Sequence, residues 1–221
     1  MKIAYDTIKQ NEEIRTYIDM ADDNLEAMGY TEHSFAHVGV VTKTAAKILR
    51  EFKYSEDDIN LVKIAAFMHD IGNNVNRTDH AISGANMAFN ILRGLNMDPV
   101  DIAKIVAAIG NHDEGSSYPV SPISAALILA DKCDVRRNRV RKEMLNDIPN
   151  IHYNVNYSVS SSKVTIDGNN RTITLDLVID TTICSVMEYF EIFLKRMKLC
   201  KLAASKLNAK FILNINGQLH S

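Results

Sequence analysis

The stretch Ile64-Ala65-Ala66-Phe67-Met68-His69-Asp70 runs from a series of apolar residues directly into a histidine and an aspartate. Upstream, Ser55 with Asp58 three residues later resembles a helix-capping box. We therefore predict a helix that begins near Ser55, is apolar almost all round and lies in the centre of the fold. His69 and Asp70 would end this helix, where side chains can leave the packed surface and point into a cavity.

Helical patterns also surround this stretch. Apolar residues spaced three and four apart mark these helices. The predicted helix starts are Ser34, Asp98-Pro99 and Ser121-Pro122, and the predicted ends are Gly29 and Gly110. The predicted helices cover residues 12–28, 34–49, 79–92, 99–109 and 121–144.

The pattern changes at Pro149. Residues 153–159, 164–166 and 172–178 alternate between apolar and polar side chains, as strands do, and a Gly/Asn turn at 167–170 joins the last two. A helix over 182–207 and a short strand over 211–215 follow. We predict a mainly α fold: a helical bundle over residues 1–147, then a small α+β segment over 148–221 with an antiparallel meander, a helix and a short strand. This segment could serve homodimer formation, with a lid or a regulatory site as the alternatives.

Composition narrows the class of protein. The chain has 221 residues, a net charge of −2 and a pI of about 6.4, so no global positive field would attract a nucleic acid. Cys133, Cys184 and Cys200 are widely separated, which favours reduced thiols in a cytoplasmic protein. No signal-peptide core or bilayer-length apolar run is present in the sequence, so a membrane partner is not expected.

Histidines and aspartates recur near the predicted helix ends, and divalent metals need such imidazoles and carboxylates from separate elements. Asp131 is the most informative of them, because it interrupts the apolar run 125–130, and burying a carboxylate is costly unless a cation or hydrogen bonds compensate. An ion pair between Asp131 and Arg136 is the simpler alternative, and His33 fits no ligand pattern. The ordered set nevertheless indicates a metal site formed by His37, His69, Asp70, His80, His112 and Asp131.

This ordered series, over residues 33–142, resembles the HD-domain superfamily of metal-dependent phosphohydrolases. The resemblance implies a helical bundle with a metal site between helices. It also implies one or two divalent ions, drawn from Fe, Mn, Zn, Co, Ni and Mg. By the family pattern, a first ion would be held by His37, His69, Asp70 and Asp131, and a second by His80 and His112, with Asp70 bridging the two.

The order of the motifs is most similar to that of the HD-type diadenosine tetraphosphate hydrolases. His80 precedes Gly84-Ala85, and His112 is a single histidine, whereas the cyclic-di-GMP phosphodiesterase branch has two adjacent histidines where this chain has Asn111-His112. The resemblance implies hydrolysis of a phosphate ester or phosphoanhydride in a small phosphorylated substrate, a nucleotide or dinucleotide. The alternatives are a nucleotide-binding signalling module without turnover, a cyclic-dinucleotide phosphodiesterase and a nuclease.

The expected catalytic residues are Asp70 as the bridging ligand, His80 in the second site and Asp113 as a proton acceptor beside His112. A solvent-exposed loop acid is the alternative for Asp113. Positively charged side chains should neutralise the phosphate. If the predicted helix that carries Asp131 continues, Lys132 and Arg136 share one of its faces at positions i and i+4. For the basic run that follows Asp131, a solvated surface is the alternative. The predicted phosphate-binding residues are Arg77, Lys132 and Arg136.

Overall fold

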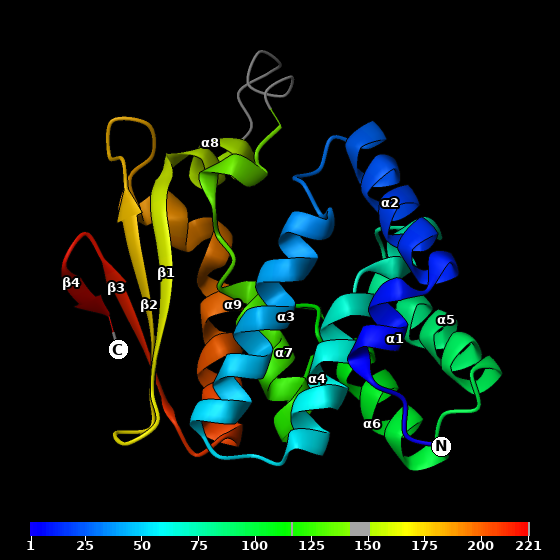
Figure 1. The fold of residues 1–221 in the computed structure, drawn as a ribbon. Coiled ribbons are helices and arrows are strands. Elements are labelled where there is room, and N and C mark those ends of the chain that lie inside the picture. The colour runs from blue at the N-terminus through cyan, green and yellow to red at the C-terminus, as the bar shows by residue number, and fades with distance from the viewer. Residues whose placement is uncertain (116, 142–150, 221) are drawn as a thin grey trace.

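The computed structural model describes residues 1–115, 117–141 and 151–220 and confirms a mainly helical fold with a small sheet at the C-terminal end (Figure 1). The helical part contains α1 (Tyr5–Gln10), α2 (Glu12–Ala27), α3 (Phe35–Glu51), α4 (Glu56–Met68), the 3₁₀ helix η1 (Ile71–Asn74), α5 (His80–Gly94), α6 (Pro99–Gly110), α7 (Pro122–Lys132) and the 3₁₀ helix η2 (Arg137–Arg139). The C-terminal part contains α8 (Ile151–Ser158), β1 (Val159–Asp167), β2 (Thr172–Ile179), α9 (Val186–Lys206), β3 (Lys210–Ile215) and β4 (Gln218–His220).

Helix α4 lies in the centre of the helical part, as its apolar sequence predicts. It packs against α1, α3, α6 and α7, and Ile64 and Ala65 are completely shielded from solvent. The Ser55 hydroxyl accepts a hydrogen bond from the Asp58 backbone N–H, which confirms the predicted cap. Because α4 is enclosed by its neighbours, the His69-Asp70 pair that follows it is held in a fixed position.

Helix α7 is shorter than the predicted 121–144 element and ends at Lys132. Asp134 supplies the physical reason. Its carboxylate accepts a hydrogen bond from His37 Nδ1 at 2.8 Å, and its backbone carbonyl accepts one from Arg139 at 2.9 Å. These bonds hold residue 134 outside the helical path. The predicted end at Met144 lies outside the described residues.

The predicted strand over 153–159 is wrong, because residues 151–158 form helix α8 and the strand begins at Val159. The short alternating pattern did not reveal the long-range contacts that stabilise the helix. Arg137 donates hydrogen bonds to the carbonyls of Tyr157 and Ser158, which satisfies helix-end acceptors that would otherwise lack partners. Tyr153 donates its hydroxyl to the Gly29 carbonyl, which fixes α8 against the loop after α2.

The sheet has the order β1-β2-β3-β4. Strands β1 and β2 form the predicted antiparallel hairpin, whereas β2 and β3 pair in parallel, with Leu175 opposite Leu213. A parallel pair needs a long crossover connection, and α9 provides it. Helix α9 begins at Val186 rather than near residue 182, because Ser185 and Glu188 form a capping box there. Strand β4, which pairs with β3, was not predicted from the sequence.

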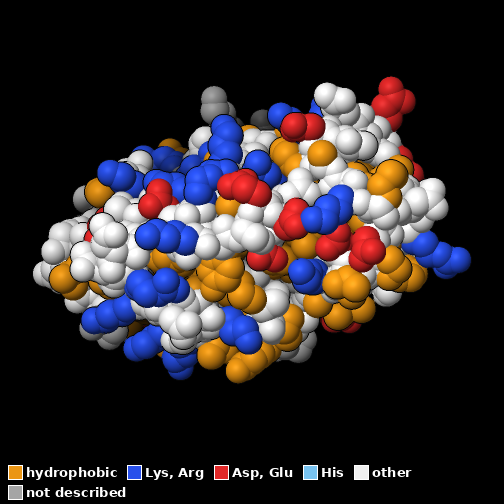
Figure 2. All heavy atoms as spheres, turned by 60° about the horizontal axis from the view of Figure 1, so that its bottom comes forward, with side chains coloured by type: hydrophobic (Ala, Val, Ile, Leu, Met, Phe, Trp, Pro, Cys, Tyr) orange, Lys and Arg blue, Asp and Glu red, His pale blue; other side chains and the backbone are white. Residues whose placement is uncertain are grey.

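Helix α9 lies between the sheet and the helical part (Figure 1). Its buried side chains include Phe193 and Cys200, whereas Lys195, Lys198 and Lys201 are exposed on its outer surface. Figure 2 shows basic side chains gathered on the side of the molecule where α9 and the sheet lie. The outward surface of helix α9 is therefore mixed, because Met187, Leu194 and Leu202 are exposed beside the lysines.

One cluster of buried apolar side chains runs from the helical part through α9 to the sheet. The domain division between residues 147 and 148 stays a prediction, because the boundary lies outside the described residues. Homodimer formation likewise stays a prediction. Across the described ranges, no helix has both the length and the apolar character required to cross a bilayer.

Gly72 permits close packing of η1 against α5. A Cβ atom at this position would lie 2.0 Å from the His80 carbonyl oxygen and 2.4 Å from the Gly84 backbone nitrogen. We therefore expect Gly72→Ala to lower the free energy of unfolding by about 3 kcal/mol. Denaturant titration measures this. The control is Gly39→Ala in α3, where nothing lies within 4 Å of the added Cβ and helix propensity predicts a gain of about 1 kcal/mol. Equal stability of the two variants would contradict this packing account.

Candidate metal centre

Each of four buried imidazoles has its Nδ1 atom fixed by a hydrogen-bond acceptor. The pairs and their distances are His37 with Asp134 Oδ2 at 2.8 Å, His69 with the Ala66 carbonyl at 2.8 Å, His80 with the Arg77 carbonyl at 3.0 Å and His112 with the Ile109 carbonyl at 2.6 Å. Because an acceptor faces Nδ1, that atom carries the proton, and in the neutral ring Nε2 presents a lone pair. Local backbone carbonyls at His69, His80 and His112, and the distant Asp134 at His37, thus leave Nε2 as the ligand atom.

Two of these Nε2 atoms face two carboxylates. His69 Nε2 lies 3.1 Å from Asp70 Oδ2 and 3.8 Å from Asp131 Oδ1, and His37 Nε2 lies 3.7 Å and 3.4 Å from the same two oxygens. Both Nε2 atoms are buried and have no hydrogen-bond partner among the described residues. A lone pair that faces a carboxylate is repelled by it unless a proton or a metal ion lies between them. These two imidazoles and two carboxylates therefore form the donor set of a cation site, and a bound cation would remove their mutual repulsion.

The other oxygen of Asp70 faces a second pair of imidazoles. Asp70 Oδ1 lies 3.5 Å from His80 Nε2 and 3.7 Å from His112 Nε2, and the two Nε2 atoms are 3.2 Å apart. Since both Nδ1 atoms are donors, two lone pairs again point at each other. Asn73 Nδ2 donates to the Asp70 backbone carbonyl at 2.9 Å and lies 3.3 Å from Oδ1, which helps to orient this carboxylate.

The spacing of these atoms suits a divalent ion. Ligand atoms about 2.1 Å from one metal lie about 3.0 to 3.4 Å from each other, close to the separations found here. The candidate ligand groups, whose atoms lie within 4.8 Å of one another, are His37-His69-Asp70, His69-His112-Asp131 and Asp70-His80-His112. Nitrogen and oxygen donors of this kind fit iron, manganese, zinc, cobalt or nickel.

Charge in the cluster also favours a cation. Burial would raise the pKa of both Asp70 and Asp131, but His69 beside Asp70 and Lys132 beside Asp131 hold both pKa values well below their ordinary range. Burial would lower the pKa of His69, yet the nearby Asp70 raises it overall. Burial lowers the pKa of His80 to about 4, so this ring is neutral near pH 7. A metal ion would replace the proton that His69 otherwise takes up, so binding should release protons.

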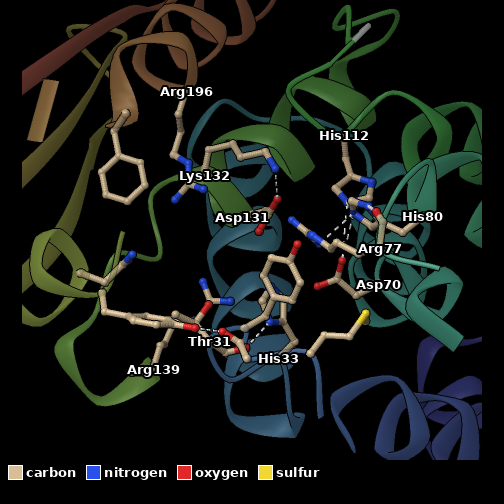
Figure 3. Close-up of a pocket in the computed structure, with 16 residues that line it drawn as sticks. Thr31, His33, Asp70, Arg77, His80, His112, Asp131, Lys132, Arg139 and Arg196 are labelled. Carbon is tan, nitrogen blue, oxygen red and sulfur yellow. Dashed lines mark hydrogen bonds and ion pairs between the residues drawn. The ribbon is translucent and has the colours of Figure 1, made fainter. Parts of the chain in front are cut away.

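The ligand cluster opens into a cavity of about 520 Å³. Figure 3 shows Asp70, His80 and His112 on one side of this cavity and Lys132 and Arg196 on the opposite side. The full lining comprises Met28, Gly29, Tyr30, Thr31, His33, Asp70, Arg77, His80, His112, Asp131, Lys132, Arg139, Tyr153, Asn156, Phe193 and Arg196. The lining is therefore rich in cations and contains several aromatic rings.

Two of the predicted phosphate-binding residues line this cavity. Arg77 Nη1 lies 3.4 Å from His80 Nε2, and Lys132 Nζ lies 2.9 Å from Asp131 Oδ2. Asp113 pairs with Lys132 at 3.5 Å but is not part of the lining. Burial would raise the pKa of Asp113, whereas Lys132 lowers it overall, so this acid is ionised. Its predicted role as a proton acceptor stays a prediction.

Arg136 does not line the cavity, and its predicted contact with phosphate stays a prediction. Helix α7 ends at Lys132, so Lys132 and Arg136 do not share a helical face. Arg136 instead donates Nε and one terminal nitrogen to the Asp134 carboxylate, the latter at 3.0 Å. Asp134 in turn holds His37. The alternative pairing of Asp131 with Arg136 is also not found, since Asp131 pairs with Lys132.

Several cavity residues were not predicted as functional. His33 lies four residues before His37, in the segment that precedes α3, and their ring centroids are 5.4 Å apart. That spacing was a usable signal. Arg139 belongs to the basic run after Asp131, whereas Tyr153 and Arg196 come from the C-terminal segment and have no sequence signal that connects them to the site.

The match to a protein family agrees with this geometry. Residues 34–138 match the HD domain family, a range that contains every candidate ligand. The chain is 26% identical over 187 residues to an uncharacterized protein of Methanocaldococcus jannaschii, which covers 74% of this chain and 69% of the relative. A crystal structure described as a predicted HD superfamily hydrolase from an uncultured Thermotogales bacterium covers 56% of this chain and 67% of that one, with 26% identity and a TM-score of 0.44.

The fold and the site define a helical protein with a buried candidate centre for divalent metal. Over residues 34–138 the chain matches the HD domain family, which supports placing it in the HD-domain superfamily.

Metal binding should stabilise the protein. With free Mn²⁺ at 100 times its dissociation constant, the expected gain is about 2.7 kcal/mol, or a rise in Tm of about 5 to 10 °C over chelator-treated protein. Asp70→Ala should abolish this rise, because Asp70 contributes to both halves of the cluster. Differential scanning calorimetry gives the comparison. An equal rise in Asp70→Ala would show that the ion binds elsewhere.

Asp134 should act on the metal through His37. We expect Asp134→Asn to weaken Mn²⁺ or Zn²⁺ affinity about 10- to 100-fold, because the carboxylate no longer orients the imidazole and raises its basicity. Isothermal titration calorimetry measures the affinity. The control is Asp57→Asn, a change at an exposed carboxylate paired with Lys2. Unchanged affinity in Asp134→Asn would remove this role from Asp134.

Proposed function

We propose that the protein hydrolyses a phosphate ester or phosphoanhydride of a small phosphorylated molecule, a nucleotide or dinucleotide. The observation that carries the proposal is the position of Asp70. Its two carboxylate oxygens face two separate pairs of imidazoles, and the cluster opens into a cavity lined by Arg77, Lys132 and other cations. This combination of candidate metal ligands and cations around one space supports the proposal.

The metal would be held by His37, His69, Asp70 and Asp131, with His80 and His112 available for a second ion. A divalent ion bound there would supply Lewis acidity. It would polarise phosphoryl oxygens and lower the pKa of a bound water molecule to about 7. Arg77 and Lys132 would orient the phosphate and neutralise its charge.

His80 and Asp113 are the candidates for proton transfer. The His80 pKa of about 4 leaves a neutral ring at physiological pH. Asp113 lies beside Lys132 and is ionised. His80 could accept a proton at Nε2 only while this atom holds no metal ion, and Asp113 would accept one at the edge of the site rather than inside the cavity.

The shape of the cavity supports a small-molecule substrate. A volume of about 520 Å³ falls in the range of about 300 to 1,000 Å³ that is common for small-ligand sites. Tyr30 and Tyr153 in the lining offer aromatic surfaces suited to a planar base. The bond from Tyr153 to the Gly29 carbonyl joins two walls of the cavity, which favours a compact substrate over a polymer.

We expect purified protein with added Mn²⁺, Fe²⁺ or Mg²⁺ to hydrolyse at least one member of a panel of nucleoside mono- and diphosphates, diadenosine tetraphosphate, a cyclic dinucleotide and a chromogenic phosphodiester. Asp70→Ala should lower kcat/KM by at least about a thousandfold, because the bridging ligand is lost. Asp57→Asn is the control for this assay too.

Full activity in Asp70→Ala would contradict the proposed mechanism. No turnover of any member by wild-type protein that demonstrably holds metal would favour a nucleotide-binding module over an enzyme.

A further inference from the structure

The C-terminal segment forms one wall of the cavity. Helix α8 contributes Tyr153 and Asn156 to the lining, and α9 contributes Phe193 and Arg196. Cavity-lining residues thus occur well beyond the HD domain, which ends at residue 138. The segment for which the sequence left dimer, lid and regulatory roles open therefore lines the cavity.

Arg196 is the cation that α9 places in this wall. Its Nε donates to Glu114 Oε1 at 2.7 Å, and its guanidinium carbon lies 4.3 Å from the centroid of the Phe193 ring. Within the described ranges, neither terminal nitrogen of Arg196 has a hydrogen-bond acceptor. The side chain is 22% exposed, and Figure 3 shows it extending toward Lys132. The guanidinium is thus fixed at Nε and stacked on a ring, with its terminal donors available to a ligand.

Lys132 connects Arg196 to the ligand cluster. Its Nζ lies 4.0 Å from Glu114 Oε1, the same oxygen that accepts the bond from Arg196, and 2.9 Å from Asp131 Oδ2. Two cations therefore share one carboxylate at the cavity wall. Because like charges in a partly buried site repel each other, an additional anion would stabilise the pair.

The balance of charge in the lining also leaves room for this anion. The lining contains four permanent cations but only two carboxylates, Asp70 and Asp131, and both belong to the metal-ligand cluster. A metal ion would neutralise these two carboxylates. Behind the lining, Glu114 then opposes Arg196, and Asp113 opposes Lys132, so two carboxylates face the four cations.

We propose that Arg196, with Lys132 between it and the ligand cluster, forms a second anion subsite. Lys132 would contact both the phosphate that is hydrolysed and a further anionic group, and Arg196 would let the C-terminal segment select substrates that carry this further group. The selection of substrates rests on the proposed phosphohydrolase function. Binding of an anion at the subsite does not, so the two can fail separately.

The direct test is titration of inorganic pyrophosphate into the full chain in the presence of EDTA, followed by calorimetry. Chelation removes metal from the ligand cluster, where Asp70 and Asp131 then repel anions. Wild-type protein should bind pyrophosphate, and Arg196→Gln should weaken the affinity about 10- to 100-fold, as expected for loss of charge-assisted hydrogen bonds. The matched control is Arg15→Gln, since Arg15 also stacks on a phenylalanine, at 4.5 Å from the Phe35 centroid, but lies outside the cavity lining.

A variant with the opposite expected effect on pyrophosphate affinity separates anion binding from structural support. Glu114→Gln keeps the shape of the side chain but removes the charge that competes for Arg196 and Lys132. It should tighten pyrophosphate binding, whereas a purely structural role of the Arg196–Glu114 pair predicts weaker binding. Absence of pyrophosphate binding in wild-type protein, equal affinity in Arg196→Gln, or weaker affinity in Glu114→Gln would each overturn the proposal.

Kinetics test the selection of substrates. With metal present, wild-type protein should have a higher kcat/KM for ADP than for AMP, and Arg196→Gln should lower the ADP value about tenfold more than the AMP value. An equal loss on both substrates would contradict selectivity by Arg196. If wild-type protein hydrolyses neither nucleotide nor any other phosphate compound, the proposed function fails, and the pyrophosphate titration alone decides whether the subsite exists.

Discussion

The structure depends on one electrostatic constraint, the burial of the Asp70 carboxylate among imidazole nitrogens. Each of the surrounding histidines uses Nδ1 to donate to a carbonyl or to Asp134, so every Nε2 points inward. Asp70 is only 7% exposed, and its two oxygens face different pairs of rings. Such a convergence of lone pairs and negative charge is unfavourable without protons or a cation. The fold therefore requires positive charge at its centre, either as a proton on His69 or as a metal ion that replaces this proton.

The arrangement of helices follows from this requirement. The ligands lie at or near helix ends because a side chain there can leave the apolar packing, while the helix itself remains in the core. Helix α4 is enclosed by its neighbours, and Gly72 lets η1 approach the start of α5, so that Asp70 and His80 come together. Asp134 ends α7 and orients His37 in the same step. Packing and site geometry are thus determined by the same few residues.

The sequence was sufficient for those parts of the fold that depend on local pattern. Periodicity located α2 to α6, and the ordered histidines, with Asp131 in an apolar run, identified the ligand cluster. The sequence was insufficient where long-range contacts decide whether a segment forms a helix and where the helix ends. The end of α7 depends on bonds from Asp134 to His37 and Arg139, and α8 depends on contacts from Arg137 and to Gly29. In the sequence, Arg196 cannot be distinguished from other arginines of an amphipathic helix. Only the packing of α9 against α7 brings it to the cavity.

The most direct test of the central claim is anomalous diffraction from crystals of the protein loaded with Mn²⁺. The account predicts an anomalous peak within bonding distance of Asp70 and of the Nε2 atoms of His37 and His69, next to Asp131. Any second peak should lie on the side of Asp70 that faces His80 and His112. An anomalous peak beyond bonding distance of Asp70, or imidazole rings that face the ion through Nδ1, would contradict the account.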